Sequence, residues 1–144
     1  MAVHKDVGHY GAPITLDQAK KVMAAAEAKA IENNWYVAIS IMDSGGNPVM
    51  LHRLDGTQRL NSHRRRQGSH RAVEFRRPTK ALEDVIARGG AGLRYFTVPN
   101  VNFMEGGVPI LVDGKIVGGI GVLGVDSKDK LLRLGLTPLG DRCD

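Results

Sequence analysis

The sequence has little cysteine and few aromatic residues, and it has no long hydrophobic run. The single cysteine, Cys143, excludes an internal disulfide and a cysteine-rich metal cluster. No apolar stretch reaches the ~20 residues that cross a bilayer, so we expect no membrane partner. The segment MAVHKDVGHYGAP at the start lacks the continuous apolar stretch of a secretory signal, which predicts a cytoplasmic protein.

The composition is that of an ordinary globular domain. The 144 residues are 42% hydrophobic and 24% charged, which is enough to bury one core without disulfides. Two separate domains would each be small for independent folding. We therefore predict a single domain over residues 1–144.

The excess of positive charge is confined to one segment. The net charge is +5, and residues 59–77 hold seven arginines against one acid, Glu74, so the rest of the chain is close to neutral. Such a stretch is able to bind phosphate backbone. It contains one aromatic residue, Phe75, and no recognisable nucleic-acid motif surrounds it. A solvated basic face is the favoured interpretation, and we expect no nucleic-acid partner.

Two segments carry helix signals. Thr15 and Gln18 have the spacing of a capping box, and apolar residues at intervals of three and four follow, which predicts a helix over 16–33. Pro78 begins a second, shorter helix over 80–88, which a glycine pair closes.

Two segments carry hairpin signals. β-rich runs at 35–42 and 48–54 flank a polar turn, and runs at 108–112 and 115–125 flank Asp113-Gly114. Strands that are adjacent in sequence favour antiparallel pairing. The predicted fold class is therefore α+β, a two-layer arrangement with an antiparallel sheet and helices packed on it.

The last predicted strand is unusually rich in glycine. Glycines at this density in a strand indicate a bulge, or the close approach of another backbone or of a flat ligand. Residues 119–124 match GxGxxG in letters, but they lie inside a predicted strand with no long helix after it, so dinucleotide binding is not favoured.

Residue types that carry chemistry are sparse. The histidines form no HExxH motif, and of the five only His9 and His52 are considered as ligands of an iron or other metal centre. For a single histidine a surface role is favoured, because histidine ligands act in groups or with a cofactor. Asp43, Asp55 and Glu105 adjoin glycine-rich turns, where carboxylates could serve as acid and base. Turn chemistry explains Asp43 and Asp55 equally well, and we assign no catalytic residue.

Four strings of the chain, taken together, resemble the GlcG/HbpS family of haem-degrading or haem-binding-like domains, which is related to the C-terminal domain of PduO-type proteins. The strings are ITLDQAKKVMAAAEAKA, MDSGGNPVMLHRLDG, FRRPTKALED and EGGVPILVDGKIVGGIGV. The resemblance covers about residues 13–125, leaving 1–12 as an N-terminal extension and 126–144 as an atypical tail. It implies a profilin-like fold, assembly into dimers or higher homo-oligomers, and binding of haem or a related tetrapyrrole in some members.

The resemblance also implies a site. A flat macrocycle needs an apolar slot, cations for its propionates and, where it is ligated, an axial donor. His52 or His9 is the candidate axial ligand, and Arg53 is the candidate partner of a propionate. Because side chains alternate along a strand, only one of His52 and Arg53 should face a given pocket. The remaining candidate ligand-binding residues are Asp55, Glu105, Gly106, Gly107, Gly118 and Gly119, of which the glycines would open the slot.

Three functions stay open on these grounds. The first is a non-enzymatic small-molecule-binding protein, accessory to a glycolate, diol or glycerol utilisation pathway, because relatives are encoded in such operons. The second is an enzyme that acts on a small hydroxy acid or aldehyde with Asp55 or Glu105 as acid or base. The third is an assembly partner of a corrinoid-dependent enzyme.

Two segments depart from the family pattern. Relatives carry a small-residue amphipathic helix where this chain has the string SHRRRQG, residues 62–68, whose charged centre supplies no apolar face. The tail over 131–144 lacks the expected closing helix rich in alanine. One choice of codons for residues 62–68, read one nucleotide later, encodes Ala-Ile-Asp-Val-Ala-Lys-Gly, which is family-like. We therefore hypothesise that a local frame shift produced the basic stretch, and that the tail is a second case.

Overall fold

The long helix forms where the sequence predicts it. The computed structural model describes residues 8–58, 70, 72–98 and 106–124. Helix α1 (Leu16–Glu32) begins after Thr15, whose hydroxyl accepts from the Gln18 backbone N–H while the Gln18 side chain accepts from the Thr15 N–H. Both bonds of the capping box are therefore made, and they satisfy donors that a helix start otherwise leaves free.

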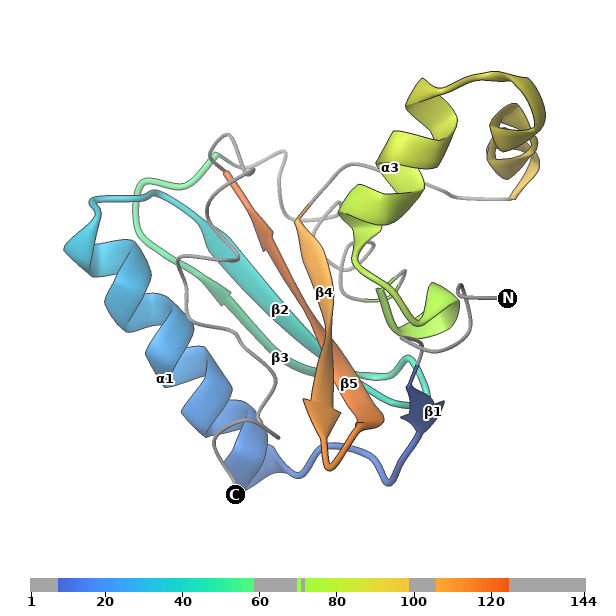
Figure 1. Ribbon diagram of the computed structural model, residues 1–144. Helices are drawn as coiled ribbons and strands as arrows, with labels where there is room; N and C mark the ends of the chain where they lie inside the picture. The colour runs from blue at the N-terminus through green and yellow to red at the C-terminus, as the bar shows by residue number, and fades with distance from the viewer. Residues whose placement is uncertain (1–7, 59–69, 71, 99–105, 125–144) are drawn as a thin grey trace.

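Both predicted hairpins form and share one sheet (Figure 1). The first joins β2 (Ala38–Asp43) to β3 (Pro48–Arg53), and the second joins β4 (Gly107–Val112) to β5 (Lys115–Leu123). Strand β5 also pairs antiparallel with β2, so that the two hairpins lie side by side. Among the described strands, β3 and β4 consequently lie at opposite edges of the sheet.

Two elements differ from expectation. β1 (His9–Tyr10), within the predicted N-terminal extension, pairs in parallel with the first residues of β5, so the sheet is mixed rather than antiparallel throughout. After α3 (Thr79–Ala87), the chain forms η2 (Gly90–Thr97), a 3-10 helix that the sequence patterns did not predict. The α+β fold class is confirmed.

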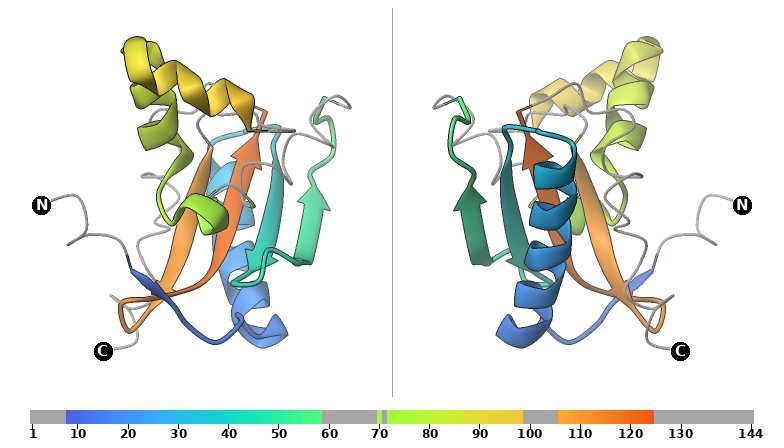
Figure 2. Two further views of the ribbon diagram at one scale, coloured as in Figure 1. Left: turned by 90° about the vertical axis from the view of Figure 1, so that its right-hand side faces the viewer. Right: turned by 90° about the vertical axis from the view of Figure 1, so that its left-hand side faces the viewer.

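The two faces of the sheet are covered by different parts of the chain (Figure 2). Helix α1 lies on one face, and the helical residues 72–75 lie on the other. The α1 face holds a continuous apolar cluster. Its buried members are Ile14, Ala19, Val22, Met23, Ala26, Ala30, Val37, Ile39, Ile41, Ile110, Val117, Ile120 and Val122.

The described ranges set the limits of several expectations. Within 8–58, 70, 72–98 and 106–124, no helix combines the length and apolar character needed to cross a membrane. The arginine-rich string at 62–68, the tail from 125 and Glu105 lie outside these ranges, as does the frame-shift hypothesis that rests on the first two.

Candidate functional site

His52 lies on edge strand β3 and points to the same side of the sheet as α1. Its cross-strand neighbour on β2 is Ile39, which belongs to the cluster under α1. Directly opposed residues of an antiparallel pair share a face. The His52 side chain, which is 45% exposed, there meets Glu27 of α1, and its Nδ1 is hydrogen-bonded to Glu27 Oε1.

This contact uses Nδ1 of His52, and no described residue is bonded to the other ring nitrogen, Nε2. An ionised carboxylate only accepts hydrogen bonds, so the imidazole Nδ1 carries the proton and donates to Glu27. In the neutral ring the unprotonated nitrogen is then Nε2, which is able to bind a metal or accept a proton. Metal-binding histidines are commonly held in this way by a carboxylate on their other nitrogen.

Arg53 does not join His52. It is the next residue of β3 and lies opposite Ala38, so its side chain projects from the other face of the sheet. Asp55 lies in the exposed turn that follows, just before Gly56, whose φ is +84°. An added Cβ at Gly56 would lie 2.9 Å from the ring of Tyr36, so this turn requires glycine on both counts.

His9 lies at the far end of the sheet from His52. His9 is aligned with Lys115 at the start of β5, whereas His52 is aligned through Ile39 with Val122 near its end. At the rise of a β-strand these positions are about 23 Å apart along β5. The two candidate ligands therefore belong to different sites.

The four candidate glycines lie on β4 and β5 or next to them, but not at one point. Gly107 is aligned with Gly121 and Gly106 bonds Val122, whereas Gly118 and Gly119 are aligned with Ile110 and Pro109, further toward the hairpin turn. Because side chains alternate along a strand, Gly118 and Gly119 also belong to opposite faces of the sheet. A side chain at Gly118 would clash with the carbonyl oxygen of Met42, and one at Gly106 would clash with that of Val122. These two glycines are thus explained by the close approach of neighbouring backbone, the alternative to a flat ligand. Gly107 and Gly119 stay predictions as slot residues.

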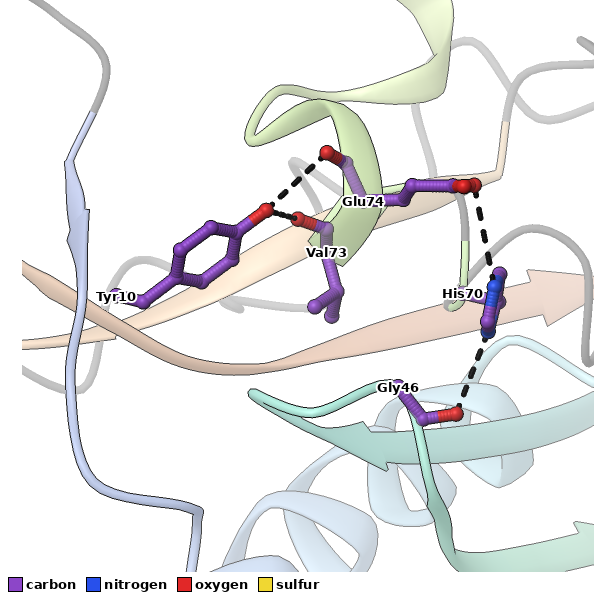
Figure 3. Close-up of polar contacts among 5 residues, drawn as sticks. All are labelled: Tyr10, Gly46, His70, Val73 and Glu74. Carbon is purple, nitrogen blue, oxygen red and sulfur yellow. Dashed lines mark hydrogen bonds and ion pairs between the residues drawn. The ribbon is translucent and has the colours of Figure 1, made fainter.

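A second polar cluster lies on the face opposite α1 (Figure 3). The Tyr10 hydroxyl donates to the carbonyl oxygen of Val73 at 2.7 Å, and the carbonyl oxygen of Glu74 lies 3.1 Å from the same hydroxyl. His70 lies between two acceptors, because its Nδ1 is 3.3 Å from the Gly46 carbonyl oxygen and its Nε2 is 3.9 Å from a Glu74 carboxylate oxygen. Both nitrogens of His70 are thus directed at protein groups, whereas in the described part of the chain only Nδ1 of His52 has such a partner.

Glu27 is the residue that sequence reasoning missed. It is 25 positions from His52, and nothing in the local sequence pattern of α1 distinguishes it from the other acids of that helix, Asp17 and Glu32. A pairing of this kind depends on how the helix crosses the sheet. In the described part of the chain, no group of three or more His, Cys, Asp or Glu side chains could hold a metal ion, so His52 would need a cofactor to supply further ligands.

Known proteins resemble this chain in sequence and in fold. Protein GlcG of Escherichia coli K12 is 33% identical over 109 residues, which cover 76% of this chain and 80% of GlcG. An uncharacterised 15.0 kDa protein of the dhaT–dhaS intergenic region of Citrobacter freundii is 33% identical over 124 residues, covering 84% and 87%.

Solved structures share the fold over most of its length. Klebsiella pneumoniae ORFY superposes with a TM-score of 0.80 at 23% identity, covering 89% of this chain and 90% of that one. The PduOC:haem complex gives 0.77 at 22% identity over 89% and 94%. A double mutant of Streptomyces reticuli HbpS gives 0.77 at 27% over 88% and 85%. The family described as haem degrading protein HbpS-like matches residues 14–130, and the chain belongs to this family.

Proposed function

We propose that the protein binds haem or a related tetrapyrrole, with His52 Nε2 as the axial donor to the metal. The observation that carries the proposal is the orientation of His52, whose Nδ1 is engaged by Glu27 while the side chain stays 45% exposed. The PduOC relative in complex with haem and the haem-degrading description of the family support the choice of ligand.

The surroundings of His52 suit a flat, anionic macrocycle. Ile31 follows Glu27 by one helical turn on the same side of α1 and is 68% exposed, so it offers apolar surface one turn from the residue that contacts the imidazole. Lys20 precedes Glu27 by two turns on that side and is exposed, so it offers a cation for a propionate. In this proposal Lys20 takes the part first expected of Arg53, which lies on the other face.

The broader role is part of the same proposal. We place the protein, as a non-enzymatic cytoplasmic homo-oligomer, in an accessory position of a glycolate, diol or glycerol utilisation pathway beside a corrinoid-dependent enzyme. The name of the Citrobacter freundii relative, which locates it between dhaT and dhaS, supports a place in such a gene cluster.

A haemin titration of the purified protein tests the proposal. We expect a saturable shift of the Soret band in the wild type, its loss in His52→Ala, and its retention in His9→Ala, which removes a histidine at the other end of the sheet. Far-ultraviolet circular dichroism of both variants shows whether each has kept its fold. A shift that survives in folded His52→Ala moves ligation elsewhere, and a wild type without a saturable shift refutes haem binding.

A further inference from the structure

We infer that Glu27 is the positioning residue of His52, the proposed axial ligand. Its carboxylate fixes the proton of the imidazole on Nδ1 and directs Nε2 outward, and it makes Nε2 a stronger electron-pair donor to the metal. The inference rests on the proposed function, since it concerns how the ligand residue of the same site is held. It adds a residue of α1 to a site otherwise built on β3.

The place of Glu27 in the fold argues against a purely helix-stabilising role. Carboxylates stabilise a helix in its first turn, where they face the positive end of the dipole. In α1 that position belongs to Asp17, whereas Glu27 lies in the second half of the helix. Glu27 also differs from Glu32, which pairs with Lys29 on the helix surface at 3.3 Å.

The partial burial of Glu27 strengthens its hydrogen bond with His52. The side chain of Glu27 is 27% exposed and lies beside the buried Ala26 and Ala30, at the boundary between α1 and the sheet. Charge-assisted hydrogen bonds in such a setting are stronger than bonds between neutral groups. Removing the carboxylate should therefore free the ring to turn and to exchange tautomers.

The expected consequence for the haem site has two parts. An imidazole that donates to a carboxylate is a more basic ligand, and loss of a partner of this kind typically weakens metal binding by about 10–100-fold. A more basic axial ligand also favours the ferric over the ferrous state, because hydrogen bonding around the axial ligand tunes the potential of haem iron. Glu27 should thus hold the midpoint potential below that of a protein with an unpartnered histidine.

Three variants separate positioning from mere folding. Glu27→Ala removes the acceptor, and Glu27→Gln keeps the size of the side chain and an acceptor oxygen but removes the charge. Glu32→Gln is the matched control, since it removes a carboxylate of the same helix whose partner is a lysine rather than His52.

Nitrogen-15 NMR of the apoprotein reads the tautomer of His52 without any haem. We expect Nδ1-protonated imidazole in the wild type and in Glu32→Gln, and a mixture of tautomers in Glu27→Ala. Predominantly Nε2-protonated His52 in the wild type would overturn the inference, whether or not the protein binds haem.

Haemin titration and redox potentiometry of the same proteins complete the test. We expect Glu27→Ala to bind haemin about 10–100-fold more weakly than the wild type. Glu27→Gln should bind haemin with an affinity between those of Glu27→Ala and the wild type, and its midpoint potential should be higher than that of the wild type. Equal affinity and potential in the wild type, Glu27→Gln and Glu27→Ala would overturn the positioning role while leaving haem binding in place. Absence of saturable binding in the wild type would overturn the proposed function, and the positioning role with it.

Discussion

The two faces of the sheet are held in different ways. Under α1, side chains from the helix, β2 and β5 form one continuous apolar cluster. On the other face, fewer apolar residues of the described chain are buried, and hydrogen bonds join the layers. The buried apolar residues outside the α1 cluster are Ala38, Met42, Ala72, Val73, Leu82 and Ile116.

The hydrogen bonds of the second face link segments that are distant in sequence. Thr79, which is fully buried at the start of α3, accepts a bond from the backbone N–H of Gly107 at 2.9 Å. Tyr10 of β1 binds the carbonyl of Val73. Apolar burial stabilises in proportion to area and tolerates small shifts, whereas a hydrogen bond contributes about 1 kcal/mol and depends on direction. The α1 face should therefore dominate stability, while the second face fixes how its segments lie.

Truncating a side chain of the α1 cluster should give the largest loss. Ile41 of β2 is fully buried in that cluster. We expect Ile41→Ala to lower the free energy of unfolding by about 4 kcal/mol, because it removes buried apolar groups and leaves a cavity. Urea denaturation measures the change. The control is Ile31→Ala, at a residue of α1 that is 68% exposed, which should change stability by less than about 0.5 kcal/mol. Similar losses in the two variants would contradict the assigned packing.

Removing the Thr79 hydroxyl should give an intermediate loss on the other face. Thr79→Val keeps the volume but leaves the Gly107 N–H buried without its acceptor, and we expect a loss of about 2 kcal/mol. Thr79→Ser keeps the hydroxyl and loses one methyl group, at about 1 kcal/mol. Thermal unfolding of the two variants compares them. If Thr79→Ser is the less stable of the two, packing rather than the hydrogen bond holds α3 against β4.

The sequence predicted the α1 face better than the other because its signals are local. The capping box at Thr15 and the Asp113-Gly114 turn each lie within a few residues of the element they specify, and both are present in the structure. β1 has two residues, too few for any periodicity, and its pairing with β5 joins positions more than 100 residues apart. No local pattern specifies such a contact.

The candidate site shows the same division. Alternation along β3 was enough to predict that His52 and Arg53 project from opposite faces, and their register with Ile39 and Ala38 places them so. The partner of His52 depends on the crossing of α1 over the sheet, which sequence spacing does not reveal. The density of glycine in β5 predicted a bulge, another backbone or a flat ligand, and at Gly118 the second alternative holds, because the neighbouring group is the Met42 carbonyl.

Removing the Tyr10 hydroxyl should give the smallest change, and one that is local. Tyr10 is 48% exposed, so water replaces part of its bond to the Val73 carbonyl, and we expect Tyr10→Phe to cost about 0.5 kcal/mol. The Arg76 guanidinium, 5.8 Å from the ring centre, keeps its aromatic partner in this variant. The effect should appear as faster hydrogen exchange at the Arg76 and Arg77 amides, which bond the carbonyls of Val73 and Ala72, with amides of α1 unchanged. Tyr36→Phe, at a ring packed on Gly56, is the control and should leave all these amides unaffected. Faster exchange in α1 as well would mean that the two faces open together, and that the hydrogen-bonded layer is not a separate unit of stability.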